Sequence, residues 1–260
     1  MESLLCVHAH PDDEALWTGG LLAKHADAGA RTAVLTCTWA EGTPRAGELA
    51  RSLEILGAEG PRLLGYADAG AGASAPEGVP RFVDVPLDEA VGQVVARIRE
   101  FRPEVVVTYD AFGGYGHEDH IHAHRVATLA AEAAGQPQLY PEAGAPWRPE
   151  ALCYATLPVS FVREVWHDLF GEAPPPAGGA GSGDGAPLPG VPDAWITDEV
   201  GIAAWGGRKW DALMAHTTEV ERGGSVTLLA SLPETTRGRL LTTEWYVNRP
   251  LAPGAPRLAR

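Results

Sequence analysis

The chain has 260 residues, which is enough for one large α/β domain, and we predict a single domain over residues 1–260. Lys and Arg total 20 against 34 Asp and Glu, so the formal net charge is −14 at pH 7. This charge disfavours nucleic acid and anionic membranes as partners. Because the sequence shows neither a long apolar run nor a signal-peptide pattern, we expect a cytoplasmic protein.

Short apolar runs alternate with helical patterns through the first half of the chain. The predicted strands cover residues 3–8, 32–37, 62–64 and 104–108, and the predicted helices cover residues 14–28, 47–56, 87–101 and 120–134. This alternation is typical of βαβ units. It predicts an α/β fold with a mostly parallel sheet and helices on both faces.

The second half carries weaker patterns. Residues 171–192 are rich in Gly, Pro and Ala and are predicted to form a flexible surface loop. Residues 201–218 have a helical pattern and residues 240–247 a strand-like one, so we expect them to complete the same domain. The three cysteines lie in strand-like runs without paired spacing, which predicts buried, reduced thiols.

A polar cluster, His-Pro-Asp-Asp-Glu at residues 10–14, directly follows the first predicted strand. Strands of a parallel sheet end where α/β proteins bind ligands. His10 and Asp13 can face one metal ion from a turn, which leaves Asp12 free as the base that takes a proton from water. Alternatively, both aspartates cap the following helix, whose N-terminus favours carboxylates. Glu14 either supports the site or pairs with the helix dipole.

A second cluster, at residues 115–120, follows the strand predicted at 104–108. His120 can supply a third ligand, and three protein ligands with an open position are typical of catalytic zinc. We assign His117 as general acid or partner of a leaving amine. Tyr115 either donates its hydroxyl to a developing oxyanion or fills a gap between glycines. Asp119 either orients a ligand histidine or caps the helix.

Three further histidines lie near these clusters. We expect His122 and His124 to be solvated helix residues, because the helical repeat prevents all the histidines of this run from facing one ion. His8 shares a side of its strand with His10 by alternation, but we predict that it is a core residue.

Residues 9–14 (Ala-His-Pro-Asp-Asp-Glu) and 116–120 (Gly-His-Glu-Asp-His) resemble the two motifs of the PIG-L/LmbE-like family of metal-dependent N-deacetylases. The resemblance implies a Rossmann-like fold and hydrolysis of an N-acetyl group on an amino sugar. It also implies zinc bound at the positions of His10, Asp13 and His120, with a base at Asp12. Residues 108–124 look most like the mycothiol-pathway branch, which comprises the N-acetylglucosaminyl-inositol deacetylase and the mycothiol S-conjugate amidase.

The resemblance also implies substrate contacts. Arg45 and Asp68 match positions that bind substrate hydroxyls in this branch, and charged groups on such loops can bind a polyol in the crevice. Surface charge and a turn are the alternatives for these two residues. His216 resembles a histidine near the metal, with a helical residue as the alternative. Trp17 departs from the branch, where this position is small or basic and helps to separate the deacetylase from the amidase.

We therefore expect a zinc-dependent hydrolase, with Fe²⁺ as the alternative metal, that deacetylates a small amino-sugar substrate such as N-acetylglucosaminyl-inositol. The alternatives are a mycothiol S-conjugate amidase, a deacetylase of an antibiotic amino sugar and a non-catalytic sugar- or metal-binding module. An iron oxygenase with two histidines and one carboxylate fits the ligand set, but it gives Asp12 no task. The sequence leaves the oligomeric state open.

Overall fold

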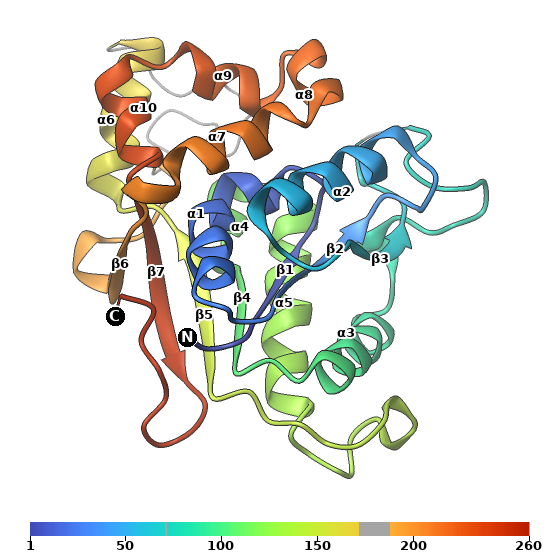
Figure 1. Ribbon diagram of the computed structural model, residues 1–260. Coiled ribbons are helices and arrows are strands. Elements are labelled where there is room, and N and C mark those ends of the chain that lie inside the picture. Colours follow the sequence, from blue (N-terminus) through green and yellow to red (C-terminus); the bar gives the residue numbers. More distant parts are fainter. Residues whose placement is uncertain (71, 172–187, 260) are drawn as a thin grey trace.

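Seven strands form one central sheet in the computed structural model of the protein, which describes residues 1–70, 72–171 and 188–259 (Figure 1). In sheet order they are β3 (Arg62–Tyr66), β2 (Thr32–Thr38), β1 (Leu4–His8), β4 (Val105–Tyr109), β5 (Ala151–Thr156), β7 (Thr243–Pro250) and β6 (Asp198–Gly201). Most of the loop predicted at 171–192 lies outside the described residues.

The first five strands pair in parallel, and β7 runs antiparallel to both β5 and β6. Every residue of β1, β2 and β4 is buried, as the continuous apolar runs predict for strands covered on both faces. The predicted α/β fold with a mostly parallel sheet is therefore confirmed. The chain leaves β1 toward β2 on one side and later adds β4 on the other, so the strand order reverses between β1 and β4.

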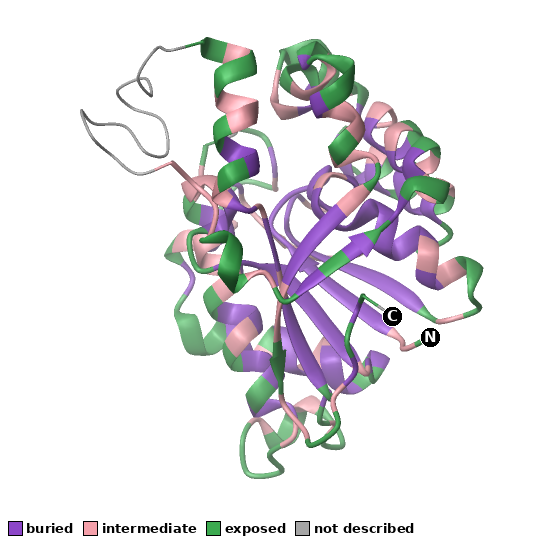
Figure 2. Cartoon of the chain, turned by 90° about the vertical axis from the view of Figure 1, so that its left-hand side faces the viewer, coloured by how far each residue is buried: buried purple, intermediate pink, exposed green. Residues whose placement is uncertain are grey.

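Helices cover both faces of the sheet. Their bounds are α1 (Asp13–Asp27), α2 (Pro44–Leu56), α3 (Leu87–Phe101), α4 (Gly113–Gly116), α5 (Glu118–Ala133), α6 (Val159–Phe170), α7 (Gly206–Met214), α8 (Thr217–Arg222), α9 (Ser225–Ser231) and α10 (Glu234–Leu240). Helices α1, α2 and α7 pack together, and α3 packs against α5. Figure 2 shows the buried strands between helices whose outer sides are exposed.

Local chemistry sets the bounds of α2. Thr43 accepts a hydrogen bond from the backbone N–H of Ala46 at 3.3 Å, and Pro44 occupies the first turn. The helix ends at Gly57, whose φ of 78° suits a residue without Cβ. The observed helix therefore begins three residues before the predicted one, which omitted this cap.

The helical pattern at 201–218 is divided in the structure. A short turn at Ala203–Trp205 precedes α7, and His216, with φ −82° and ψ 64°, separates α7 from α8. This break points the buried His216 side chain toward α1. Within the described residues, no helix has the length and apolar character needed to cross a membrane. The cysteines are free and buried, as predicted.

Candidate metal centre

A cavity of about 250 Å³ opens at the carboxyl ends of β1 and β4, where the strand order reverses. Its walls contain the side chains of most of the residues predicted for the site. The lining residues are His10, Asp12, Asp13, Leu16, Arg45, Asp68, Gly70, Tyr115, His117, Glu219, Arg222 and Ser225. Both polar clusters therefore meet at one sheet edge.

Three predicted ligand atoms converge at this cavity. His10 Nδ1 lies 3.1 Å from His120 Nε2, and each of these nitrogens lies 3.4 Å from Asp13 Oδ2. Tetrahedral zinc with bonds of about 2.0–2.1 Å separates its ligands by about 3.3 Å. The spacing of the three atoms therefore fits a metal ion.

The outer nitrogens of both imidazoles hydrogen-bond to groups outside this set of three atoms. His120 Nδ1 donates to the carbonyl of Gly113 at 3.0 Å. His10 Nε2 lies 3.2 Å from both Asp68 Oδ2 and Asp119 Oδ2, so it carries a proton and donates to carboxylate. His10 Nδ1 and His120 Nε2 are therefore the ring nitrogens that face Asp13, and each can offer a lone pair to a metal ion once it carries no proton.

Tyr109 holds the third candidate ligand, and the sequence analysis missed it. Its hydroxyl donates to Asp13 Oδ2 at 2.6 Å and accepts from the N–H of Ala9 at 2.7 Å, while its ring stacks on His120 with centroids 4.2 Å apart. Burial opposes ionisation of Asp13, yet His120 and His10 hold the pKa of its carboxyl well below the usual value. The only feature of the sequence that could have indicated this role is the position of Tyr109, whose hydroxyl group comes at the end of the buried strand β4.

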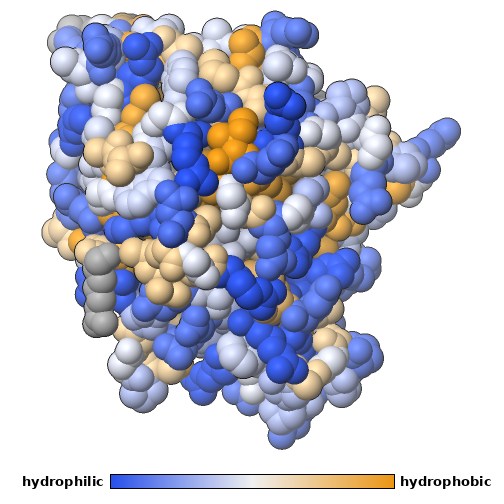
Figure 3. Space-filling view, viewed as in Figure 1, coloured by the Kyte–Doolittle hydropathy of each residue, from blue (hydrophilic) through white to orange (hydrophobic). Residues whose placement is uncertain are grey.

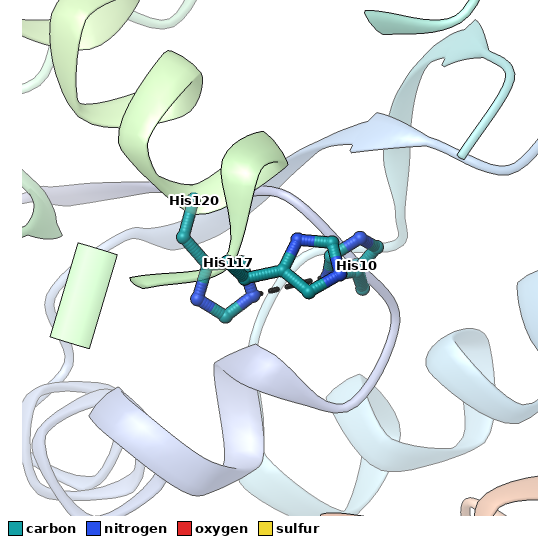
Figure 4. Close-up of side chains that lie close together, drawn as sticks. All are labelled: His10, His117 and His120. Carbon is teal, nitrogen blue, oxygen red and sulfur yellow. Dashed lines mark hydrogen bonds between the residues drawn. The ribbon is translucent and has the colours of Figure 1, made fainter. Parts of the chain in front are cut away.

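His117 offers an alternative ligand, because its ring nitrogens also approach those of His10 and His120 (Figure 4). However, His117 Nδ1 accepts a hydrogen bond from the N–H of Asp119 at 3.2 Å. Burial, with His10 and His120 nearby, lowers the pKa of His117 to about 4, so the ring is neutral and carries its proton on Nε2. That nitrogen is a hydrogen-bond donor, which favours the set of His10, Asp13 and His120.

Asp12 lies beside this set in a strained backbone conformation. Its φ of 121° is rare for a residue with a Cβ, and the Glu14 carboxylate holds it by accepting from its N–H at 2.9 Å. Arg45 Nη2 lies 3.2 Å from Asp12 Oδ2. Burial and the adjacent Asp13 carboxylate nevertheless raise the pKa of Asp12 to about 7. A carboxylate with this pKa can take up and release a proton near neutral pH.

Glu14 is fully buried and connects several elements behind Asp12. Its Oε1 accepts from Ser52 Oγ at 2.5 Å and from His216 Nε2 at 2.7 Å. Burial opposes protonation of His216, but Glu14 raises the pKa of the imidazole. His216, predicted to bind substrate, is 0 % exposed and does not line the cavity. The His216 imidazole therefore holds the Glu14 carboxylate in place, and this carboxylate in turn holds the backbone N–H of Asp12.

The other two residues predicted to bind substrate do line the cavity. Arg45 stacks on Trp39, with 4.8 Å from its guanidinium carbon to the ring centroid, and pairs with Glu219 Oε1 at 2.9 Å. Asp68 accepts from Trp39 Nε1 at 3.3 Å, so an indole stands between the two charged groups. Glu219 comes from α8 and had no recognisable signal in the sequence.

The glycine-rich segment after β4, which forms the short helix α4, brings Tyr115 to the cavity through close backbone approaches. Gly113 and Gly114 have φ values of 66° and 76°. A Cβ on Gly113 would lie 2.5 Å from His120 Cβ, and one on Gly114 would lie 2.4 Å from the Trp17 ring. Burial raises the pKa of Tyr115, so its hydroxyl stays protonated and can donate.

The remaining histidines lie outside the cavity walls. His8 is a core residue, as predicted, with Nε2 3.0 Å from Thr18 Oγ1. His122 packs against Phe82, and His124 Nδ1 donates to the carbonyl of Tyr109 at 2.9 Å. These two side chains are half-buried and make internal contacts, so the prediction of simply solvated residues was incomplete.

The mostly parallel sheet, with this cluster at the carboxyl ends of its central strands, defines a Rossmann-like α/β protein with a candidate metal centre. Comparison with known proteins extends this assignment. The PIG-L family, described as GlcNAc-PI de-N-acetylase, matches residues 5–131. The chain belongs to this family.

The chain is similar to several proteins that carry the name 1D-myo-inositol 2-acetamido-2-deoxy-alpha-D-glucopyranoside deacetylase. The protein from Rhodococcus jostii (strain RHA1) is 43% identical over 84% of this chain and 81% of the relative. The protein from Streptomyces avermitilis is 38% identical over 94% of this chain and 90% of the relative.

Solved structures share the fold. A conserved protein of Thermus thermophilus superimposes with a TM-score of 0.64 at 25% identity, over 99% of this chain and 97% of the other. The N,N'-diacetylchitobiose deacetylase of Pyrococcus horikoshii has a TM-score of 0.64 at 15% identity, over 97% of this chain and 87% of the other.

Proposed function

We propose that the protein is a metal-dependent deacetylase that removes the acetyl group from N-acetylglucosaminyl-inositol. One observation carries the proposal: His10 Nδ1, His120 Nε2 and Asp13 Oδ2 lie within 3.4 Å of one another, beside an aspartate that is outside this ligand set. The substrate is inferred from the names of relatives at 38–43% identity.

His10, Asp13 and His120 would hold the ion, and zinc is the metal that their nitrogen and oxygen atoms fit, with Fe²⁺ as the alternative. The bound metal supplies a Lewis acid that activates water and polarises the amide carbonyl. Tyr109 and the Gly113 carbonyl orient the ligands from outside. Asp68 and Asp119 do the same for His10 Nε2.

The remaining side chains divide the proton chemistry. Asp12 accepts a proton from the attacking water and returns it to the amide nitrogen as the C–N bond breaks. Tyr115 donates a hydrogen bond to the carbonyl oxygen, where negative charge develops. His117 donates from Nε2–H and assists the departing amine. A C–O bond to the water oxygen forms as the C–N bond breaks, and the second proton of the water also passes to the amine, so that the products are acetate and the protonated amine.

Arg45 and Asp68 stand on the polar wall and are proposed to bind hydroxyls of the sugar or inositol. Glu14 and His216 lie behind the cavity wall and are proposed as positioning residues. Glu14 positions Asp12, and His216 positions Glu14. The non-catalytic binding module gives no task to an aspartate held in a strained conformation. Free, buried cysteines support the proposed cytoplasmic location.

Release of free amine tests the proposal directly. Chelator-stripped protein is assayed with and without added zinc on N-acetylglucosaminyl-inositol, N-acetylglucosamine and a mycothiol S-conjugate. We expect zinc-dependent amine release, fastest from N-acetylglucosaminyl-inositol. Absence of release from all three substrates by protein that binds zinc stoichiometrically would overturn the proposed reaction.

A further inference from the structure

A row of four charged side chains with alternating sign runs outward from the metal centre. Asp12 Oδ2 lies 3.2 Å from Arg45 Nη2, and Arg45 Nη1 lies 2.9 Å from Glu219 Oε1. The same Glu219 oxygen lies 2.8 Å from Arg222 Nη2. The first three residues are buried, whereas the Arg222 side chain is 57 % exposed. Arg222 is therefore the outer end of this charged row.

Arg222 also lines the polar cavity that contains the metal centre. It lies on α8, which contacts α2, the helix that carries Arg45. Helices α7 to α10 form a layer above α1 and α2 in Figure 1, and hydrophilic side chains cover much of this layer at the top of Figure 3. Because Arg222 lines the cavity and is also largely exposed to solvent, it stands at the cavity mouth.

The two arginines of the cavity differ in the donors that they have left. Arg45 is 3 % exposed, its Nη2 contacts both Asp12 and the carbonyl of Pro11, and its Nη1 pairs with Glu219. Within the described residues, the Arg222 guanidinium pairs through Nη2 alone. A guanidinium has five N–H donors. Arg222 therefore keeps most of its donors for a ligand at the mouth.

We propose that Arg222 determines substrate specificity by donating hydrogen bonds to hydroxyls of the polyol ring that is attached to the amino sugar. The inference rests on the proposed function and deepens it, because it assigns the second ring of the substrate to one side chain. Hydrogen bonds from a guanidinium to hydroxyl oxygens are charge-assisted and stronger than those between neutral groups. Arg222 lies outside residues 5–131, so this recognition does not come from the region that matches the family.

The shape of the proposed substrate fits this assignment. In N-acetylglucosaminyl-inositol, neighbouring carbons of the sugar carry the acetamido group and the inositol ring. The acetamido group has to reach the buried cluster of His10, Asp13 and His120 for hydrolysis. Arg45 and Asp68, both buried, face the sugar. The inositol ring is then left toward the mouth, where Arg222 stands.

The first test compares two rings of similar size on one sugar. The cyclohexyl glycoside of N-acetylglucosamine has the second ring but lacks its hydroxyls. We expect kcat/KM for N-acetylglucosaminyl-inositol to exceed that for the cyclohexyl glycoside by at least about tenfold, which is the lower end of what one hydrogen bond to a charged group contributes. Arg222→Met should reduce this preference to within about threefold, mainly through KM, because the donors are lost. Equal use of the two glycosides by the unaltered protein overturns the assignment, as does an undiminished preference in Arg222→Met.

A matched control has the same kind of ion pair elsewhere. Arg97 pairs with Glu100, three residues further along α3, at 3.1 Å, as Arg222 pairs with Glu219 on α8, but Arg97 does not line the cavity. Arg97→Met should therefore keep the full preference for the inositol substrate.

A second variant separates contact with the substrate from an effect along the charged row. Arg222→Lys keeps a positive charge beside Glu219 but loses the planar pair of donors. We expect it to lower the preference too, by less than Arg222→Met. An equal loss of kcat on both glycosides in Arg222→Met would show instead that Arg222 acts on Asp12 through Glu219 and Arg45, and would overturn the proposal.

Binding without turnover separates this inference from the proposed function. Calorimetry on Asp12→Asn should show tighter binding of N-acetylglucosaminyl-inositol than of the cyclohexyl glycoside, and adding Arg222→Met should weaken the tighter binding by about tenfold. Zinc-dependent release of amine with equal binding of both glycosides would leave the deacetylase intact and remove Arg222 from substrate recognition. Absence of hydrolysis of every amide would overturn the deacetylase, while the calorimetry would still measure what Arg222 binds.

Discussion

His216 Nε2 donates to Glu14 Oε1 at 2.7 Å, a contact between residues 202 positions apart that joins the C-terminal helices to the first motif. Glu14 in turn accepts from the N–H of Asp12, whose φ is 121°. The family match ends at residue 131, so this support for the proposed base comes from beyond the matched region. These two hydrogen bonds explain why Asp12 stays in a backbone conformation that costs about 1–3 kcal/mol.

Separate substitutions should divide metal binding from proton transfer. We expect Asp12→Asn to retain stoichiometric zinc and lose at least about 100-fold in kcat, because loss of a general base typically costs 10²–10⁴-fold. His120→Ala should lose both zinc and activity. Metal content by atomic emission and amine release on the same preparations check this division.

The zinc content of His117→Gln tests the alternative ligand set of His10, His117 and His120. If His117 is a donor and not a ligand, the variant keeps its zinc and loses turnover. Zinc loss equal to that of His120→Ala would show instead that the three histidines form the ligand set.

Removal of the Tyr109 hydroxyl should weaken the metal site without unfolding the protein. Tyr109→Phe leaves the stacked ring but removes the donor to Asp13. Substitutions of this kind reduce metal affinity by about 10–100-fold, and zinc titration against a chromophoric chelator measures the change. Tyr154→Phe is the control, because the Tyr154 hydroxyl contacts Thr128 at 3.4 Å and Tyr154 does not line the cavity, so the same change should leave the zinc affinity unaltered. An unchanged zinc Kd in Tyr109→Phe would remove Tyr109 from the site.

Loss of the Glu14 carboxylate should destabilise the fold. Glu14→Ala leaves the buried His216 without its partner, and breaking a buried pair costs about 3–5 kcal/mol. Urea unfolding of metal-free protein measures this difference. Glu164 pairs with Arg239 at the surface, so Glu164→Ala should cost no more than about 1 kcal/mol. Equal effects of both substitutions would contradict the supporting role of Glu14.

The pH dependence of stability should include a contribution from His8. Burial lowers the pKa of His8 from 6.5 to about 4. As pH falls through 6.5, the unfolded chain binds a proton that the folded state still rejects, so the stability is lost between about pH 6.5 and pH 4. A shift of this size corresponds to roughly 3 kcal/mol. We expect urea unfolding of His8→Phe to show a shallower loss over this window, and an unchanged slope would rule out this contribution.

Sequence patterns predicted four of the five parallel strands and the meeting of the two motifs, whereas β5 was indicated only by the strand-like run around Cys153. Strand β1 was predicted to within one residue at its start, and β4 to within one residue at each end. Because both strands are parallel and adjacent, their carboxyl ends share one edge, which brings His10 and His120 together. The short strand β6 was not predicted, because its four residues, Asp-Glu-Val-Gly, include only one large apolar side chain.

Contacts between distant side chains were decided by the tertiary structure alone. The sequence could not show that Tyr109 holds Asp13, that Glu219 reaches Arg45, or that His216 lies behind the cavity instead of in its wall. The spacing of apolar residues depends only on residues close together in the sequence. Strands, helices and the loops at their ends can therefore be predicted from short segments. Which polar side chain satisfies another, and how Asp12 keeps its backbone strain, depends on packing among residues up to 202 positions apart.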